Sequence, residues 1–237
     1  MRRAEFIADD INIDDSDVFH FTAERVLYKL GFDYQHNQIW KYAHVCLSIS
    51  ICFTVKGYGG AVYTRWGKTG CPFKTQLVYK GIAGGTHYSH KAGPANILCL
   101  PDNPEYGNHT PGFQSQGAIY GTEYETKQHS ISFKHLHNHD VPCAVCRSTT
   151  KTSVIMVPAK MSCFPGWHVE YTGYLMGGHY NYAASEYLCV DGDAEKDRSG
   201  HENKNGQLLY LVEGVCGSLP CPPYKNYWEL RCTVCSK

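Results

Sequence analysis

The sequence has no apolar run long enough to cross a membrane. Its longest mostly apolar stretch, residues 45–55 (VCLSISICFTV), is interrupted by serine and threonine. A transmembrane helix needs about 20 consecutive apolar residues. We therefore predict no membrane span.

The N-terminus lacks the apolar core of a secretory signal. Met1-Arg2-Arg3 is followed by Glu5 and an acidic run where a signal peptide would be apolar (Asp9, Asp10, Asp14, Asp15 and Asp17). The cysteine content of the chain favours export, so we expect this N-terminus to be an incomplete start.

Charge of neither sign is in excess, since 22 basic residues balance 22 acidic ones. Nucleic-acid-binding surfaces are usually strongly basic, so we expect no nucleic-acid partner. The sequence also lacks a Gly-X-Y run, which excludes a collagen triple helix. We identify no internal repeat, no nucleophile elbow and no phosphate-binding glycine loop followed by lysine. We therefore predict a protein that is not an enzyme and needs no cofactor.

Cysteine, by contrast, is abundant. Ten of the 12 cysteines lie in residues 57–237, among many glycines and tyrosines. An even number at this density in a turn-rich region predicts a disulfide framework made in an oxidising compartment. The spacing leaves the pairing open. The cysteines expected in disulfides are Cys71, Cys99, Cys143, Cys146, Cys163, Cys189, Cys216, Cys221, Cys232 and Cys235.

Two CxxC pairs leave other chemistry open. Cys143 with Cys146, and Cys232 with Cys235, have the spacing of a four-cysteine zinc site. A thioredoxin-like redox pair is a further alternative, but it needs a βαβ context that the pattern lacks. Six cysteines of the region would have no partner in a zinc scheme. We therefore favour disulfides and predict no metal.

From residue 57 onward, short β-prone runs alternate with glycine and proline turn signals. The predicted strands cover residues 61–66, 76–80, 117–125, 153–157, 168–174 and 208–213, and a short helix is expected at residues 183–187. Strands without helical crossovers predict an all-β fold, either an antiparallel sandwich or a barrel with long loops.

Residues 1–56 differ in composition from the rest. We assign them to an N-terminal appendage, and residues 57–237 to the disulfide-rich β domain. Ser16 can cap a short helix that ends at Gly31, and residues 45–55 predict a strand.

A histidine run could serve a chemical function. His135, His137 and His139 would share one face of an extended strand. They could then bind zinc or copper, or act in a hydrolase. A polar loop is the interpretation that we favour, because no further ligand or supporting residue is evident.

An acidic segment and a glycosylation sequon are the other polar motifs. Alternating carboxylates follow the spacing of a calcium loop, but Lys196 stands where an EF-hand requires glycine; the carboxylates are Asp191, Asp193, Glu195 and Asp197. We favour a solvated turn. Asn108-His109-Thr110 has the pattern of an N-glycosylation site, although Pro111 follows it.

Tyrosine outnumbers phenylalanine by 18 to 9. Aromatic rings with a polar tip suit surfaces that are partly wet. We predict an aromatic ligand-binding surface that includes Trp66, Tyr88 and Trp167. Core packing is the alternative role for these rings, because aromatic residues are also favoured in strands.

Five sequence blocks resemble one family. The chain is similar, over about residues 59–237, to the C-terminal non-collagenous domain of the short-chain, spongin-like collagens of invertebrates. That resemblance implies an extracellular, disulfide-bonded, matrix-associated module with no firmly attached biochemical activity. The blocks are residues 63–72 (YTRWGKTGCP), 81–90 (GIAGGTHYSH), 139–146 (HDVPCAVC), 173–178 (GYLMGG) and 216–224 (CGSLPCPPY).

These observations together predict a secreted, non-catalytic structural or interaction module of the extracellular matrix. Its expected partners are matrix proteins or glycans, and homo-oligomers are compatible with the sequence. A lectin-like carbohydrate-binding module is the alternative function. A metal-dependent hydrolase that uses His135, His137 and His139 is a less favoured one.

Overall fold

The computed structural model describes residues 43–46, 52–55, 60–113, 117–127, 133–197 and 202–237. The chain divides into two compact units, Met1–Gly57 and Tyr58–Lys237. In the first unit, β1 (Ala43–Cys46) and β2 (Cys52–Val55) pair antiparallel. The single strand predicted over residues 45–55 is therefore wrong, because the chain folds back within it. The predicted N-terminal helix lies outside the described residues and has no support.

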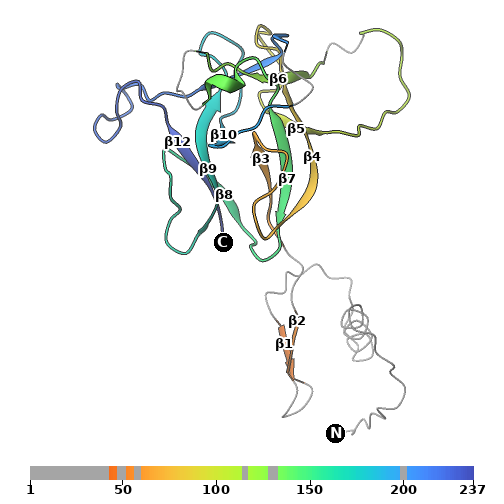
Figure 1. Ribbon diagram of the computed structural model, residues 1–237, viewed down its shortest axis with the longest axis vertical. Coiled ribbons are helices and arrows are strands. Elements are labelled where there is room, and N and C mark those ends of the chain that lie inside the picture. The colour runs from red at the N-terminus through yellow and green to blue at the C-terminus, as the bar shows by residue number, and fades with distance from the viewer. Residues whose placement is uncertain (1–42, 47–51, 56–59, 114–116, 128–132, 198–201) are drawn as a thin grey trace. The chain divides into compact units, whose positions relative to one another are not determined.

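The second unit is all-β, as predicted, and Figure 1 shows its strands. Seven of them close into a barrel in the order β3, β7, β4, β6, β11, β9, β10 and back to β3. The strands are β3 (Val62–Trp66), β4 (Thr75–Gly85), β5 (Leu98–Pro101), β6 (Tyr120–Tyr124), β7 (Pro142–Ser148), β8 (Val154–Pro158), β9 (His168–Gly177), β10 (Leu188–Asp191), β11 (Gln207–Leu211) and β12 (Arg231–Ser236).

Two details of the prediction need correction. The barrel is not purely antiparallel, because β10 pairs with β3, and β11 with β6, in parallel. The short helix expected at residues 183–187 is absent, and these residues form an irregular connection between β9 and β10. Within the described part of the chain, no helix is long and apolar enough to cross a membrane.

The second unit consists of two equivalent halves, β3 to β7 and β8 to β12. In each half the long second strand pairs with the third, fourth and fifth strands, and the first strand pairs with the fifth. The registers agree as well, since Gly81 lies opposite Cys143 and Gly173 lies opposite Cys232. The interpretation that the chain holds no internal repeat is therefore wrong. The repeat is evident in the strand pairing and in the order of the cysteines. The residues between the cysteines show it much less clearly.

The disulfide prediction is confirmed, and the bonds follow the repeat. In each half the first cysteine bonds the last and the second bonds the last but one, with sequence separations of 75 and 44 in one half and 72 and 43 in the other. A fifth bond closes a short loop in the second half. The pairs are Cys71–Cys146, Cys99–Cys143, Cys163–Cys235, Cys189–Cys232 and Cys216–Cys221.

Strand geometry explains why the CxxC pairs do not bond internally. Cys143 and Cys146 are three positions apart on β7, and side chains alternate between the faces of a strand. Their sulfurs therefore leave opposite faces and reach different partners. Cys232 and Cys235 do the same on β12. This geometry excludes the four-cysteine zinc site and the redox pair.

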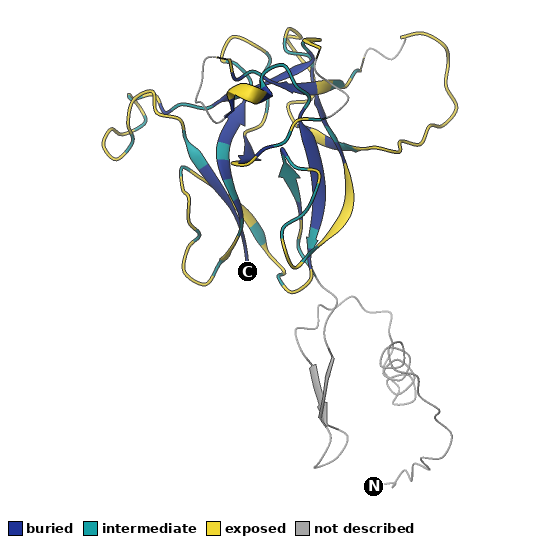
Figure 2. Cartoon of the chain, in the orientation of Figure 1, coloured by how far each residue is buried: buried dark blue, intermediate teal, exposed yellow. Residues whose placement is uncertain are grey.

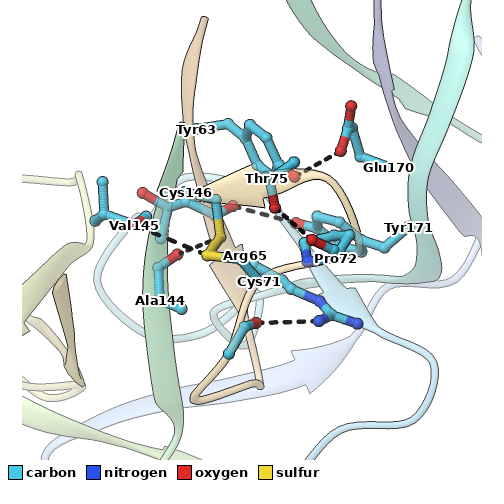
Figure 3. The surroundings of a disulfide bond; sticks show 12 residues. Tyr63, Arg65, Cys71, Pro72, Thr75, Ala144, Val145, Cys146, Glu170 and Tyr171 are labelled. Carbon is cyan, nitrogen blue, oxygen red and sulfur yellow. Dashed lines mark hydrogen bonds between the residues drawn. A yellow bond between two sulfur atoms is a disulfide. The ribbon is translucent and has the colours of Figure 1, made fainter. Parts of the chain in front are cut away.

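Two buried clusters hold the halves together, and Figure 2 shows the buried strands. One contains Tyr124, Phe133 and Met176, each almost fully buried. The other contains Tyr63 and Tyr171. At its edge Tyr63 Oη donates a 2.7 Å hydrogen bond to Glu170, so the two halves share a polar contact as well (Figure 3).

Candidate functional site

The three aromatic residues predicted to form one binding surface lie apart. All three are half-buried. Trp66 ends β3 and lines a groove between the two halves. Tyr88 lies in the turn after β4, and Trp167 immediately precedes β9. No ring contact joins these three within the described residues, so each belongs to different surroundings.

The groove at Trp66 has a volume of about 470 Å³, and β8 contributes Val154, Ile155 and Met156 to its walls. The buried hydroxyl of Tyr171, which also lines the groove, already forms hydrogen bonds within the protein. Tyr171 Oη donates to the carbonyl oxygens of Thr64 (3.3 Å) and Cys189 (2.9 Å), and burial raises the pKa of Tyr171. The Tyr171 hydroxyl is therefore not free to bind a ligand in this groove.

Tyr88, in contrast, belongs to a network of eight aromatic rings. Six of the rings lie in two turns, one in each half, which follow the equivalent strands β4 and β9. The other two are Tyr120 of β6 and Tyr210 of β11. Consecutive ring centroids lie between 4.2 and 6.2 Å apart. We call this set the His–Tyr cluster; its members are His87, Tyr88, His90, Tyr120, His179, Tyr180, Tyr182 and Tyr210.

The two parts of the cluster match in detail. His87 lies edge-on to Tyr120 at 4.9 Å between ring centroids, and His179 lies edge-on to Tyr210 at 5.1 Å. The backbone turns are closed in the same way, because His90 N–H donates to the His87 carbonyl and Tyr182 N–H to the His179 carbonyl, at 3.0 and 2.9 Å.

Contacts across the repeat join the two turns. The rings of Tyr88 and Tyr182 meet edge to face at 4.8 Å, and Ala183 N–H donates to the Tyr88 carbonyl at 3.1 Å. Burial raises the pKa of Tyr210, and the charge of Glu125 raises it further. A hydrogen bond with the Tyr182 side chain raises this pKa as well, so the Tyr210 hydroxyl is protonated and engaged within the cluster.

Sequence reasoning singled out Tyr88 but did not bring the other members of the cluster together with it. The signal was a His-Tyr dipeptide that closely follows glycine in both halves, in residues 85–88 (GTHY) and 177–180 (GGHY). It becomes informative only once strand pairing shows that β4 and β9 are equivalent.

The histidine run does not form the strand on which its metal site depended. Residues Lys134–Leu136 form a 3-10 turn, so the three imidazoles do not line one face. His137 Nδ1 lies 3.4 Å from a carboxylate oxygen of Glu125, and the ring of His139 contacts the His137 carbonyl. No group of three or more His, Cys, Asp or Glu side chains among the described residues is placed to hold a metal ion.

The acidic segment that begins at the end of β10 forms ion pairs with basic side chains of the first half. Arg65 contacts Asp191 at 2.8 Å, while Lys68 lies 2.8 Å from Asp193 and 3.2 Å from Glu195. These contacts pin the segment against the turn after β3, which leaves its carboxylates engaged by protein cations.

Lys68 makes stability depend on pH. Partial burial raises the pKa of Glu195, but hydrogen bonds from Thr69 and the ammonium of Lys68 outweigh it and hold that pKa below its usual value. A lowered folded-state pKa gives stability that is present above the unfolded value, about 4.3, and is lost as pH falls through the folded value.

We therefore expect Lys68→Met to destabilise the protein at pH 7 by up to about 1 kcal/mol, as for a partly exposed pair, and to flatten the acid side of its stability profile. Denaturant unfolding at pH 7 and at pH 3 measures both effects. Lys80→Met is the control, because Lys80 and its partner Asp102 are both exposed and 3.8 Å apart. Equal acid sensitivity in wild type and Lys68→Met would contradict this assignment.

No protein-family model matches the chain.

Proposed function

We propose that this protein is a secreted, non-catalytic structural or interaction module of the extracellular matrix. The disulfide arrangement is the observation that supports this most. Two equivalent nested pairs lock the two halves, and such frameworks persist in oxidising compartments. The resemblance to the non-collagenous domain of short-chain collagens supports a matrix partner, either a matrix protein or a glycan, and is compatible with homo-oligomers. Asn108 is exposed and fits a glycosylated loop.

A lectin-like function is the second candidate, and the His–Tyr cluster favours it. Lectin sites combine flat aromatic faces with hydroxyl and imidazole groups that form hydrogen bonds, and the cluster supplies both. A hydrolase is the weaker alternative, since His135, His137 and His139 do not converge on one point.

Expression in animal cells tests the main proposal. We expect the secreted chain to show a mass, before and after reduction, that accounts for disulfides at all ten cysteines of residues 57–237. We also expect it to be retained on cell-derived matrix after washing. Intracellular retention with free thiols would contradict secretion. Hydrolysis of an ester, peptide or glycoside that disappears in a folded His137→Ala variant would contradict the non-catalytic assignment.

A further inference from the structure

The two turns of the His–Tyr cluster fix their histidines in the same state. Ser89 N–H donates to His87 Nδ1 at 3.3 Å, with the Ser89 hydroxyl 2.9 Å from the same nitrogen, and Asn181 N–H donates to His179 Nδ1 at 3.2 Å. A ring nitrogen that accepts a hydrogen bond carries no proton, so in the neutral imidazole the proton sits on Nε2. Each half therefore places one such imidazole beside an aromatic ring, His87 beside Tyr120 and His179 beside Tyr210.

Packing within the protein does not explain why the most exposed ring of the cluster is held in place. Tyr180 stacks on His179 with ring centroids 4.2 Å apart and an interplanar angle of 28°, yet it is 87 % exposed. One face of the tyrosine is thus held by the imidazole while the other faces solvent. In the other turn the counterpart of Tyr180 is Tyr88, which is half-buried against Tyr182. The accessible ring there is His90, which lies edge-on to Tyr120 at 5.5 Å. Each half contributes an accessible ring.

The charge of this surface selects among ligands. The turn residues 85–90 and 177–182, with Tyr120 and Tyr210, contain no Lys, Arg, Asp or Glu. The exposed Lys91 follows the first turn, and the charge of Glu125 reaches Tyr210, so one cation and one carboxylate flank the cluster without an excess of either sign. A sulfated or otherwise anionic glycan would need cationic partners here. A neutral sugar needs a flat ring for its C–H face and separate donors and acceptors for its hydroxyls, and both turns supply these.

We propose that the His–Tyr cluster binds a linear, neutral, β-1,4-linked glycan, with the two turns acting as two adjacent subsites, one at Tyr180 and one at His90. The chemistry of a chain of equatorially linked pyranoses fits this surface, because each unit presents the same flat face. The two turns would then contact two units of the same glycan chain. This inference rests on the lectin-like candidate function and specifies its ligand.

Calorimetric titration of the oxidised full chain with chitohexaose, cellohexaose and their disaccharides tests the proposal. A second subsite on the same ligand adds affinity without a second association cost, so we expect one hexasaccharide to bind at least tenfold more tightly than its disaccharide. Tyr180→Ala should weaken hexasaccharide binding roughly tenfold, the scale of one aromatic contact. His90→Ala, in the other turn, should weaken it as well.

Tyr106→Ala is the matched control, because Tyr106 is 86 % exposed and lies outside the cluster. It should leave affinity unchanged, and thermal melting confirms that each variant is folded. Hexasaccharide binding that is independent of length, or sensitive to only one turn, would overturn the two-subsite proposal and leave a lectin-like function standing. No binding of either hexasaccharide at millimolar concentration would overturn both, without affecting the matrix-module assignment.

Discussion

Gly81→Ala and Gly173→Ala will each destabilise the protein by at least about 4 kcal/mol, or prevent its secretion. A Cβ atom at Gly81 would lie 1.6 Å from the Leu100 carbonyl oxygen, and one at Gly173 would lie 1.7 Å from that of Val190. Both obstacles are backbone atoms of the neighbouring strand, β5 or β10, so no side chain can move aside. The strands must separate, and effects of this size are exceptional for single substitutions.

Gly121→Ala is the control for this prediction. Gly121 also lies in a strand, β6, but a Cβ there would meet nothing within 4 Å. We expect a change within about 0.5 kcal/mol, typical of an exposed surface position. Denaturant unfolding of the oxidised proteins, or secreted yield where a variant does not fold, gives the comparison. Similar stability of Gly81→Ala and Gly121→Ala would show that β4 and β5 are not as closely apposed as described here.

The two glycines also test whether the halves are equivalent in stability. Gly81 and Gly173 occupy the same register in the two halves, opposite Cys143 and Cys232. If the halves are equivalent in energy as well as in pairing, the two alanine variants will lose similar amounts of stability.

The sequence was sufficient for the fold class and for the disulfide state. Both depend on local signals, namely turn residues between β-prone runs and a high, even number of cysteines. The strands that escaped prediction are β5, β7, β10 and β12, and every one of them carries a disulfide cysteine. The cysteines of β7 (PCAVCRS) and β12 (RCTVCS) were interpreted as CxxC pairs, and the strand character of these two segments went unrecognised.

The candidate site could not be read from the sequence, because it depends on long-range pairing. Tyr120 and Tyr210 face the histidines only because β6 pairs with β4, and β11 with β9. Spacing along the chain carries no trace of that arrangement. Trp66 and Trp167 were grouped from the sequence, but strand pairing places the two rings in unrelated surroundings.

Removing the inner disulfide of either half is the second change with a large expected effect. The double variants Cys99→Ala/Cys143→Ala and Cys189→Ala/Cys232→Ala each release a link that spans 44 or 43 residues. In the chain-entropy account, losing a loop of this length costs about 4 kcal/mol of unfolding free energy. Alanine suits the test because Cys143 and Cys232 are fully buried, where a serine hydroxyl would add a desolvation cost.

The short loop supplies the matched control for this prediction. Cys216 and Cys221 are only 5 residues apart, and the same entropy relation gives about 2 kcal/mol for Cys216→Ala/Cys221→Ala. Denaturant unfolding of the three double variants with their other disulfides intact measures the difference. A loss for the short loop equal to that for the inner bonds would contradict the entropic account.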